Sequence, residues 1–301
     1  MFAKRTLLFA LGAFFAQASA LKVVLTNDDG WAVAQIRAEY DALLAAGFDV
    51  VLSAPSENQS GTGSSTAAPT VLNKTCEFNT CPVGSPPEGA DKDDPFINYV
   101  NAFPVDSVRF GIQTLAPKLL GSAPDFVISG SNIGNNLGST VLISGTVGAA
   151  TEAALEGIPS FAFSGASGSQ VSFTTLNDRS ASSTTAANIY TDLVLKFVDT
   201  ILDSPAPILR KGISVNVNFA ATSNKCAAAS NYSWVFTRIN SDTKATDVNT
   251  CGTTHLPTES NAIKQGCIAT VSVFNATTKG DVDAATQKSV LDKITPILTC
   301  I

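Results

Sequence analysis

Short apolar runs alternate with helical patterns through the first half of this chain. Strands are expected at residues 23–26, 49–53, 125–129 and 160–164, and helices at 36–46, at about 104–120 and at 146–156. Strands that are separated by helices predict βαβ units, in which the strands run parallel and the helices cover both faces of the sheet. The sequence therefore predicts an α/β fold with a doubly wound, mostly parallel sheet.

In the second half of the chain, strands and helices alternate less regularly. Later elements are expected as a helix at 181–202, strands at 213–219 and 268–274, and a terminal helix at 289–298. Residues 73–101 are polar and contain prolines, so we expect a surface insertion there. Residues 226–267 are polar and contain cysteines, which favours an irregular, β-rich extension. We therefore expect an α/β core at 21–220 and a Cys-containing C-terminal extension at 221–301.

The first twenty residues have the order of a secretory signal peptide. Lys4 and Arg5 precede an apolar stretch at 7–15, and the small residues 18–20 would allow cleavage near Ala20. The apolar stretch is too short to span a bilayer comfortably, and a buried N-terminal helix is the alternative. We therefore predict a secreted protein, extracellular or in the cell wall.

The charge of the chain bears on its partners. The formal net charge is −6, and loss of the leader with its two basic residues takes it to −8. An acidic surface argues against nucleic-acid polymers and anionic membranes as main partners. It does not exclude a small anionic substrate that is held by a local metal ion.

An even number of cysteines in an exported chain indicates disulfides. Cys76 and Cys81 are expected to close a short loop. Four others lie in the last quarter of the chain and are expected to pair among themselves, in any of three ways: Cys226, Cys251, Cys267 and Cys300. Sequons for N-glycosylation occur at Asn58, Asn73, Asn231 and Asn275.

Two adjacent carboxylates follow the first predicted strand. Asp28 and Asp29 stand in the sequence Asn-Asp-Asp-Gly, directly after the apolar run at 22–26. Two neighbouring anions are unfavourable unless a cation compensates them, and Mg²⁺ and Mn²⁺ prefer oxygen ligands. A solvated Asp-Asp-Gly turn needs no metal and is the alternative. These residues alone do not decide between the two.

Three more polar segments stand where predicted strands end or a helix begins. Residues 54–61 follow the second strand, residues 129–138 follow the third, and residues 144–150 open a helix. Each segment alone fits an ordinary loop or, at Ser144, a helix N-cap. In a doubly wound sheet, however, these positions converge on one edge, and a helix start also favours a bound phosphate.

In order, the four segments contain Asn-Asp-Asp-Gly, Asn-Gln-Ser-Gly, Ser-Gly-x-Asn-x-Gly and Ser-Gly-Thr-Val-Gly-Ala-Ala. With these motifs the chain resembles, over residues 21–165, the SurE family of metal-dependent phosphatases and 5′-nucleotidases. Its secreted, Cys-bearing form is similar to the fungal acid-phosphatase branch. The resemblance implies a Rossmann-like α/β fold, one divalent cation (Mg²⁺ or Mn²⁺), a small phosphorylated substrate and a possible homodimer.

The resemblance also implies a role for each matching residue. The metal ligands would be Asp28, Asp29, Ser60 and Asn132. The phosphate side of the site would be formed by Asn27, Gly130, Ser144, Gly145 and Thr146. An all-oxygen ligand shell of this kind suits a hard cation with open water positions.

These assignments predict hydrolysis of phosphate monoesters, either nucleoside monophosphates or a broad range of acid-phosphatase substrates. Metal-activated water would attack, and one of the two aspartates would assist proton transfer. Direct attack by Asp28 or Asp29 is the competing mechanism. A non-catalytic nucleotide- or phosphate-binding protein is the alternative function. A glycan on Asn58 would favour that alternative, because it would obstruct the pocket.

The chain also departs from the family pattern. Gln35 stands where members often have glycine, and the insertion at 73–101 lies between matching motifs. Residues 226–267 diverge most, so substrate choice and oligomeric state carry over poorly. The single histidine, His255, lies in that polar segment, and histidine-based hydrolysis is therefore nearly excluded.

Overall fold

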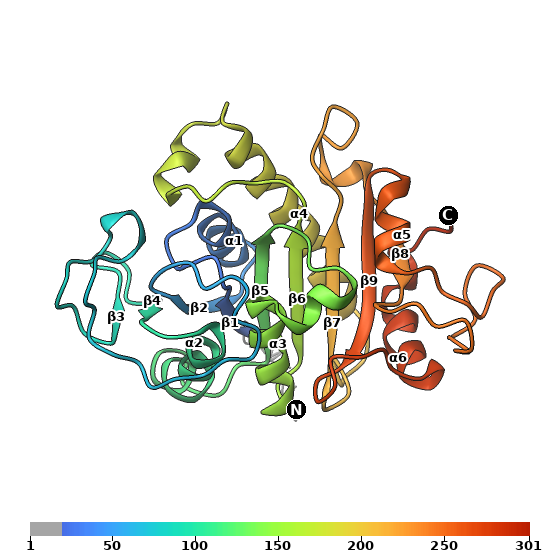
Figure 1. Cartoon of the computed structure of the whole chain (residues 1–301), viewed down its shortest axis with the longest axis horizontal. Helices are drawn as coiled ribbons and strands as arrows, with labels where there is room; N and C mark the ends of the chain where they lie inside the picture. The colour runs from blue at the N-terminus through green and yellow to red at the C-terminus, as the bar shows by residue number, and fades with distance from the viewer. Residues whose placement is uncertain (1–19) are drawn as a thin grey trace, which may run out of the picture.

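A computed structural model describes residues 20–301 of the chain. The predicted signal peptide, apart from Ala20, lies outside the described residues. Within this range one nine-stranded sheet runs through the molecule, in the order β3-β4-β2-β1-β5-β6-β7-β9-β8 (Figure 1). Its strands are β1 (Lys22–Thr26), β2 (Asp49–Pro55), β3 (Glu88–Ala90), β4 (Ile97–Val100), β5 (Phe126–Ile133), β6 (Ser160–Gly165), β7 (Ile213–Phe219), β8 (Ser233–Thr237) and β9 (Ile268–Asn275).

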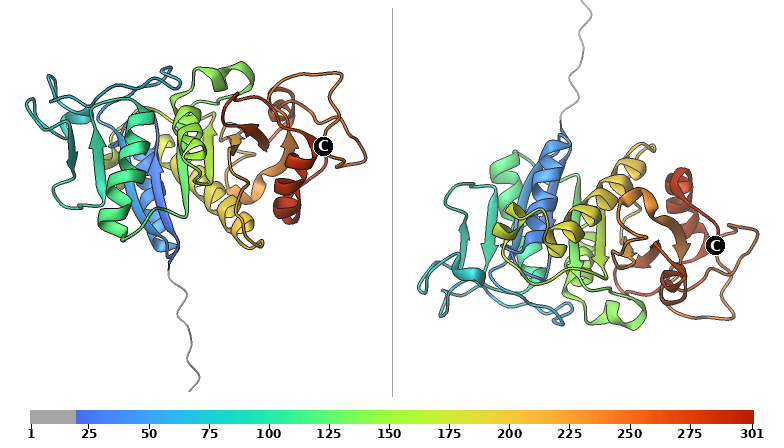
Figure 2. Two further views of the ribbon diagram at one scale, coloured as in Figure 1. Left: turned by 90° about the horizontal axis from the view of Figure 1, so that it is seen from below. Right: turned by 90° about the horizontal axis from the view of Figure 1, so that it is seen from above.

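Six neighbouring strands of the sheet, in the order β4-β2-β1-β5-β6-β7, are parallel to one another. Strand β3 runs antiparallel to β4, and β9 runs antiparallel to β7. The helices are α1 (Ala34–Ala45), α2 (Pro104–Phe110), α3 (Gly145–Leu155), α4 (Ser182–Leu202), α5 (Glu259–Ala262) and α6 (Ala284–Ile294). A π-type segment at Gly111–Leu120 continues α2. Helices α1 and α4 cover one face of the sheet, and α2 and α3 cover the other (Figure 2). The predicted Rossmann-like, mostly parallel α/β fold is thus confirmed.

Strand β1 shows how one short sequence serves both helix layers. Side chains alternate between the faces of a strand, so neighbours point in opposite directions. Val23 and Leu25 belong to the core beneath α1 and α4, whereas Val24 belongs to the core beneath α2 and α3. All three side chains are fully buried, as expected for a strand at the centre of a two-sided sheet.

Two expectations from the sequence are wrong. Residues 73–101 are more than a surface insertion, because β4 extends the sheet by pairing in parallel with β2 and is buried along its length. The terminal helix α6 begins at Ala284 and ends at Ile294, several residues earlier than expected. Asp283 caps it by accepting a hydrogen bond from the Thr286 N–H at 2.7 Å, and Pro296 stands just beyond its end.

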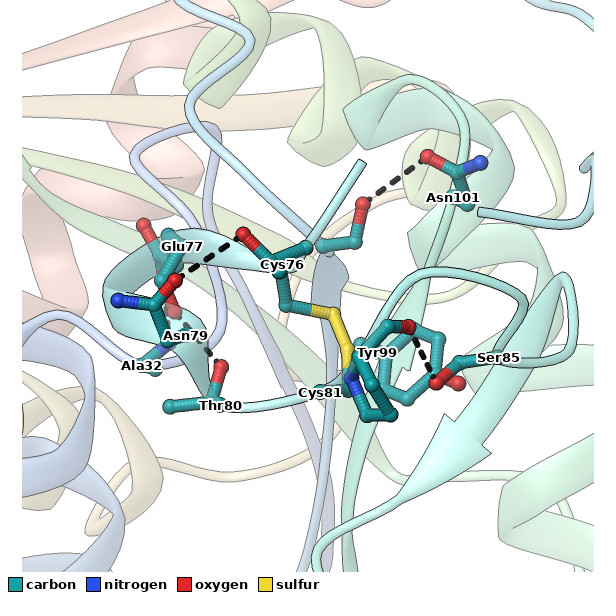
Figure 3. The surroundings of a disulfide bond; sticks show 12 residues. Ala32, Cys76, Glu77, Asn79, Thr80, Cys81, Ser85, Tyr99 and Asn101 are labelled. Carbon is teal, nitrogen blue, oxygen red and sulfur yellow. Dashed lines mark hydrogen bonds between the residues drawn. A yellow bond between two sulfur atoms is a disulfide. The ribbon is translucent and has the colours of Figure 1, made fainter. Parts of the chain in front are cut away.

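The C-terminal residues complete the same sheet through β8 and β9. The structure pairs Cys226 with Cys267 and Cys251 with Cys300, which selects one of the three pairings left open by the sequence. Cys76 and Cys81 are paired as predicted (Figure 3). Among residues 20–301, none of the helices combines the length and apolar character needed to cross a membrane.

Candidate active site

The turn that follows β1 buries two carboxylates side by side. Asp28 and Asp29 are only 2 % and 1 % exposed. The side chain of Asn27 closes this turn: its amide oxygen accepts from the Gly30 N–H at 3.2 Å, and its Nδ2 donates to the Gly30 carbonyl at 2.9 Å. Asn27 therefore shapes the loop that presents the aspartates, and its expected contact with phosphate stays a prediction.

The start of α3 points at Asp28. The backbone N–H of Thr146 donates to Asp28 Oδ2 at 3.0 Å, and the Thr146 hydroxyl donates to Oδ1 at 2.7 Å. Ser144 is the N-cap and accepts from the Val147 N–H at 3.0 Å. A Cβ on Gly145 would lie 2.8 Å from the Asp28 Cβ, so only glycine allows this close approach. The positive end of α3 is thereby directed at the carboxylate.

Asp29 is held at the end of β5 by the backbone of Ile133, the residue that follows Asn132. Asp29 Oδ2 accepts from the Ile133 N–H at 2.8 Å. The Asn132 amide oxygen lies 3.2 Å from the Thr146 hydroxyl, and its Nδ2 donates to the Gly134 carbonyl at 2.6 Å. Because a hydroxyl has one proton, and Asp28 is the nearer acceptor, the Asn132 oxygen keeps lone pairs for another partner.

Ser60 and Gly130 make no hydrogen bond to Asp28 or Asp29 in residues 20–301. Ser60 is exposed, but its neighbour Gln59 donates a backbone hydrogen bond to the Asp28 carbonyl at 2.7 Å, which holds the loop beside the site. Gly130 lies within β5 at a positive φ of 118°, and a Cβ there would come within 2.1 Å of the Phe163 carbonyl on β6. Close strand packing therefore explains this glycine, and its contact with phosphate stays a prediction.

The two carboxylates are electrostatically unfavourable without a cation. Burial raises the pKa of Asp28 despite the hydrogen bonds from Thr146. Burial, followed by the charge of Asp28, raises the pKa of Asp29 well above its usual range. Within residues 20–301 neither carboxylate forms an ion pair with a Lys, Arg or His. Buried anions without a cationic partner are costly, and a metal ion would relieve that cost.

The donor set fits a hard cation that keeps several water ligands. Over the described part of the chain, no cluster of three or more His, Cys, Asp or Glu side chains could hold a metal. The remaining protein ligands would therefore be neutral oxygens, and Asn132 is in place to supply one. Mg²⁺ is commonly bound in this way, by one or two carboxylates with water completing its shell.

Two further residues border the site and were not identified from the sequence. Gln170, in the loop after β6, donates from Nε2 to Asp29 Oδ1 at 2.5 Å. Glu77 lies in the short loop closed by Cys76 and Cys81, where its Oε1 accepts from the Ala32 N–H at 2.5 Å (Figure 3). Burial raises the pKa of Glu77 to about 8. In the sequence, only the position of the insertion at 73–101 between matching motifs indicated that Glu77 could lie near the site. Nothing in the sequence indicated a role for Gln170.

The fold and this cluster define a Rossmann-like α/β protein with paired carboxylates at the carboxyl edge of its parallel strands. A family model described as Survival protein SurE matches residues 23–246. The chain therefore belongs to the SurE family.

Curated relatives agree with this assignment. An acid phosphatase of Yarrowia lipolytica is 38% identical over 203 residues, which cover 65% of this chain and 56% of that protein. A 5′-nucleotidase SurE of Geobacter metallireducens is 38% identical over 144 residues, which cover 48% of this chain and 49% of that protein. The chain thus spans about half the length of the curated relatives it matches.

Solved structures show the same fold. The SurE protein from Aquifex aeolicus superposes with a TM-score of 0.59 at 22% sequence identity. The match covers 90% of this chain and 98% of that protein. The shared fold therefore extends over more of the chain than the family model, which matches residues 23–246.

Proposed function

We propose that this protein hydrolyses phosphate monoesters and that it requires one divalent cation, Mg²⁺ or Mn²⁺. The observation that carries the proposal is the pair of buried carboxylates, Asp28 and Asp29, which form no ion pair within residues 20–301; Asp28 is also bonded to the start of α3. Relatives named acid phosphatase and 5′-nucleotidase support the same reaction class.

Asp28, Asp29, Asn132 and Ser60 would hold the cation. When bound, it would polarise a phosphoryl oxygen and acidify a water molecule. Thr146 fixes the direction of the Asp28 carboxylate, while Gln170 and the Ile133 N–H fix Asp29. One of the two aspartates would accept a proton from the attacking water, and the dipole of α3 would favour a phosphoryl group beside Asp28.

The substrate class and cellular setting complete the proposal. A small phosphate ester fits a site that is built from one turn, one strand end and one helix start. Secretion after cleavage near Ala20 is consistent with three disulfides, which persist in oxidising compartments. A homodimer is also proposed, and sedimentation of the purified protein would test it.

Hydrolysis of p-nitrophenyl phosphate and of nucleoside monophosphates tests the reaction. Activity should disappear in EDTA, return on addition of Mg²⁺ or Mn²⁺, and be abolished in D28N. Activity that survives EDTA, or a D28N variant as fast as the wild type, would contradict the proposal. Mass spectrometry of the Asn58 peptide addresses the alternative of a binding protein, because a glycan there would stand beside the site.

A further inference from the structure

A hollow beside the paired carboxylates has no role in the reaction described above. It is lined by Glu57, Asn58, Thr75, Glu77, Phe78 and Gln170. Gln170 joins the hollow to the site, because the same side chain donates to Asp29 at 2.5 Å. A phosphate held at Asp28 and Asp29 would therefore have this hollow as a neighbour, within reach of the rest of its ester.

Phe78 presents an aromatic ring at this hollow. Its side chain is 39% exposed, although large apolar side chains are usually buried. Its φ is +52°, and that of the following Asn79 is +58°, a left-handed conformation that is uncommon for bulky residues. Strained, exposed residues of this kind persist where the surrounding structure holds them, and they cluster at ligand sites.

The loop that carries Phe78 is anchored directly to the turn that carries Asp29. Glu77 accepts from the Ala32 N–H, and its own N–H donates to the Ser56 carbonyl at 3.0 Å. The Cys76–Cys81 disulfide closes the loop (Figure 3). A hydrogen bond from the Asn79 N–H to the Cys76 carbonyl, at 3.1 Å, also joins its two sides. Phe78 is thus held at a fixed place relative to the carboxylates.

We propose that this hollow binds the leaving group of the phosphate ester, and that Phe78 stacks on a planar ring of that group. An aromatic face flanked by the amides of Asn58 and Gln170 suits a nucleobase or another aromatic ring, because stacking and amide hydrogen bonds both recognise flat polar rings. A small aliphatic leaving group such as glycerol offers no ring to stack. The inference rests on the proposed function and adds a preference for aromatic monophosphates.

Replacing Phe78 tests the proposal. F78A should raise the KM for AMP and for p-nitrophenyl phosphate about tenfold, which is the size of one aromatic stacking contact. The KM for glycerol 2-phosphate should not change. F78L keeps an apolar side chain without ring faces and should behave like F78A, whereas F78W should keep the wild-type KM. V83A is the matched control, because Val83 is 62% exposed in the same insertion and does not line the hollow.

Two results would overturn the proposal: an unchanged KM for AMP in both F78A and F78L, or an equal rise for AMP and glycerol 2-phosphate. Binding of adenosine, measured by calorimetry with the metal-free protein, separates this proposal from the reaction itself. If the wild type hydrolyses no phosphate ester but binds adenosine in a Phe78-dependent way, the proposed function fails and the hollow remains a ring-binding site. If hydrolysis is intact and adenosine does not bind, the hollow is not such a site.

Discussion

Thr146 binds the carboxylate of Asp28 at two points, with its backbone N–H 3.0 Å from one oxygen and its hydroxyl 2.7 Å from the other. The start of α3 is therefore occupied by a carboxylate of the protein itself. A phosphate that binds near the start of α3 would therefore lie beside Asp28. The arrangement fixes the direction in which Asp28 presents its remaining lone pairs.

Loss of the Thr146 hydroxyl should weaken the site without unfolding the protein. T146V keeps the shape of the side chain and the backbone hydrogen bond but leaves Asp28 Oδ1 without its donor. Removal of a group that orients a metal ligand typically costs about 10–100-fold in metal affinity or activity, and we expect a loss of that size in kcat/KM. T146S restores the hydroxyl and should recover most of the activity. A T146V enzyme as active as the wild type would show that Asp28 needs no such support.

Charge repulsion between Asp28 and Asp29 should be visible in the stability of the metal-free protein. In D28N the new amide oxygen can accept from the Thr146 N–H while its Nδ2 donates to the hydroxyl, so both contacts are kept. We therefore expect D28N to have a higher Tm than the wild type in EDTA at neutral pH, because burial raises the pKa of both aspartates and the substitution removes part of that cost. Differential scanning calorimetry measures both values.

Addition of Mg²⁺ or Mn²⁺ should then raise the Tm of the wild type and leave that of D28N almost unchanged. This pair of measurements needs no substrate, so it tests the cation site separately from catalysis. Equal metal-induced shifts in the two proteins would place the cation elsewhere.

Hydropathy and turn patterns predicted the elements that build this site because each reflects local chemistry. The expected strand at 23–26 corresponds to β1, and Asp28 and Thr146 meet as expected from strand ends and a helix start that converge on one edge. Long-range contacts were not readable. Gln170 reaches Asp29 from 141 positions away, in a loop with no motif. Strand β4 was missed because a four-residue strand in a polar, proline-containing segment has little periodicity of its own.

Gly145 should tolerate no side chain. An alanine Cβ there would lie 2.8 Å from the Asp28 Cβ and 2.9 Å from Pro104 Cγ, so Asp28 or the helix start must move. Since small displacements of catalytic groups are costly, we expect G145A to lose at least about tenfold in kcat. G280A is the matched control, because the nearest atom to a Cβ on Gly280 would be the Thr278 hydroxyl oxygen, at 3.3 Å. An active G145A would mean that the contact can relax freely.

Buried Glu39 should make the protein less stable as the pH rises. Its carboxyl accepts two hydrogen bonds from Ser131, yet burial raises its pKa from 4.5 to about 8. Folded protein therefore keeps a proton that unfolded chain releases above its pKa of 4.5. The contribution of this proton to the free energy of unfolding is complete at a pH below about 4.5, and it is lost as the pH rises towards 8.

E39Q should flatten this dependence, because the Gln amide stays neutral at every pH and its oxygen can still accept from Ser131. Urea unfolding at about pH 5, 6.5 and 8 should show a smaller fall in the free energy of unfolding for E39Q than for the wild type. Part of the fall should remain, because burial also raises the pKa of Glu259 to about 8. E88Q, at a half-buried position on β3, is the control and should keep the wild-type slope. Parallel curves for E39Q and the wild type would show that Glu39 is ionised in the folded protein across this range.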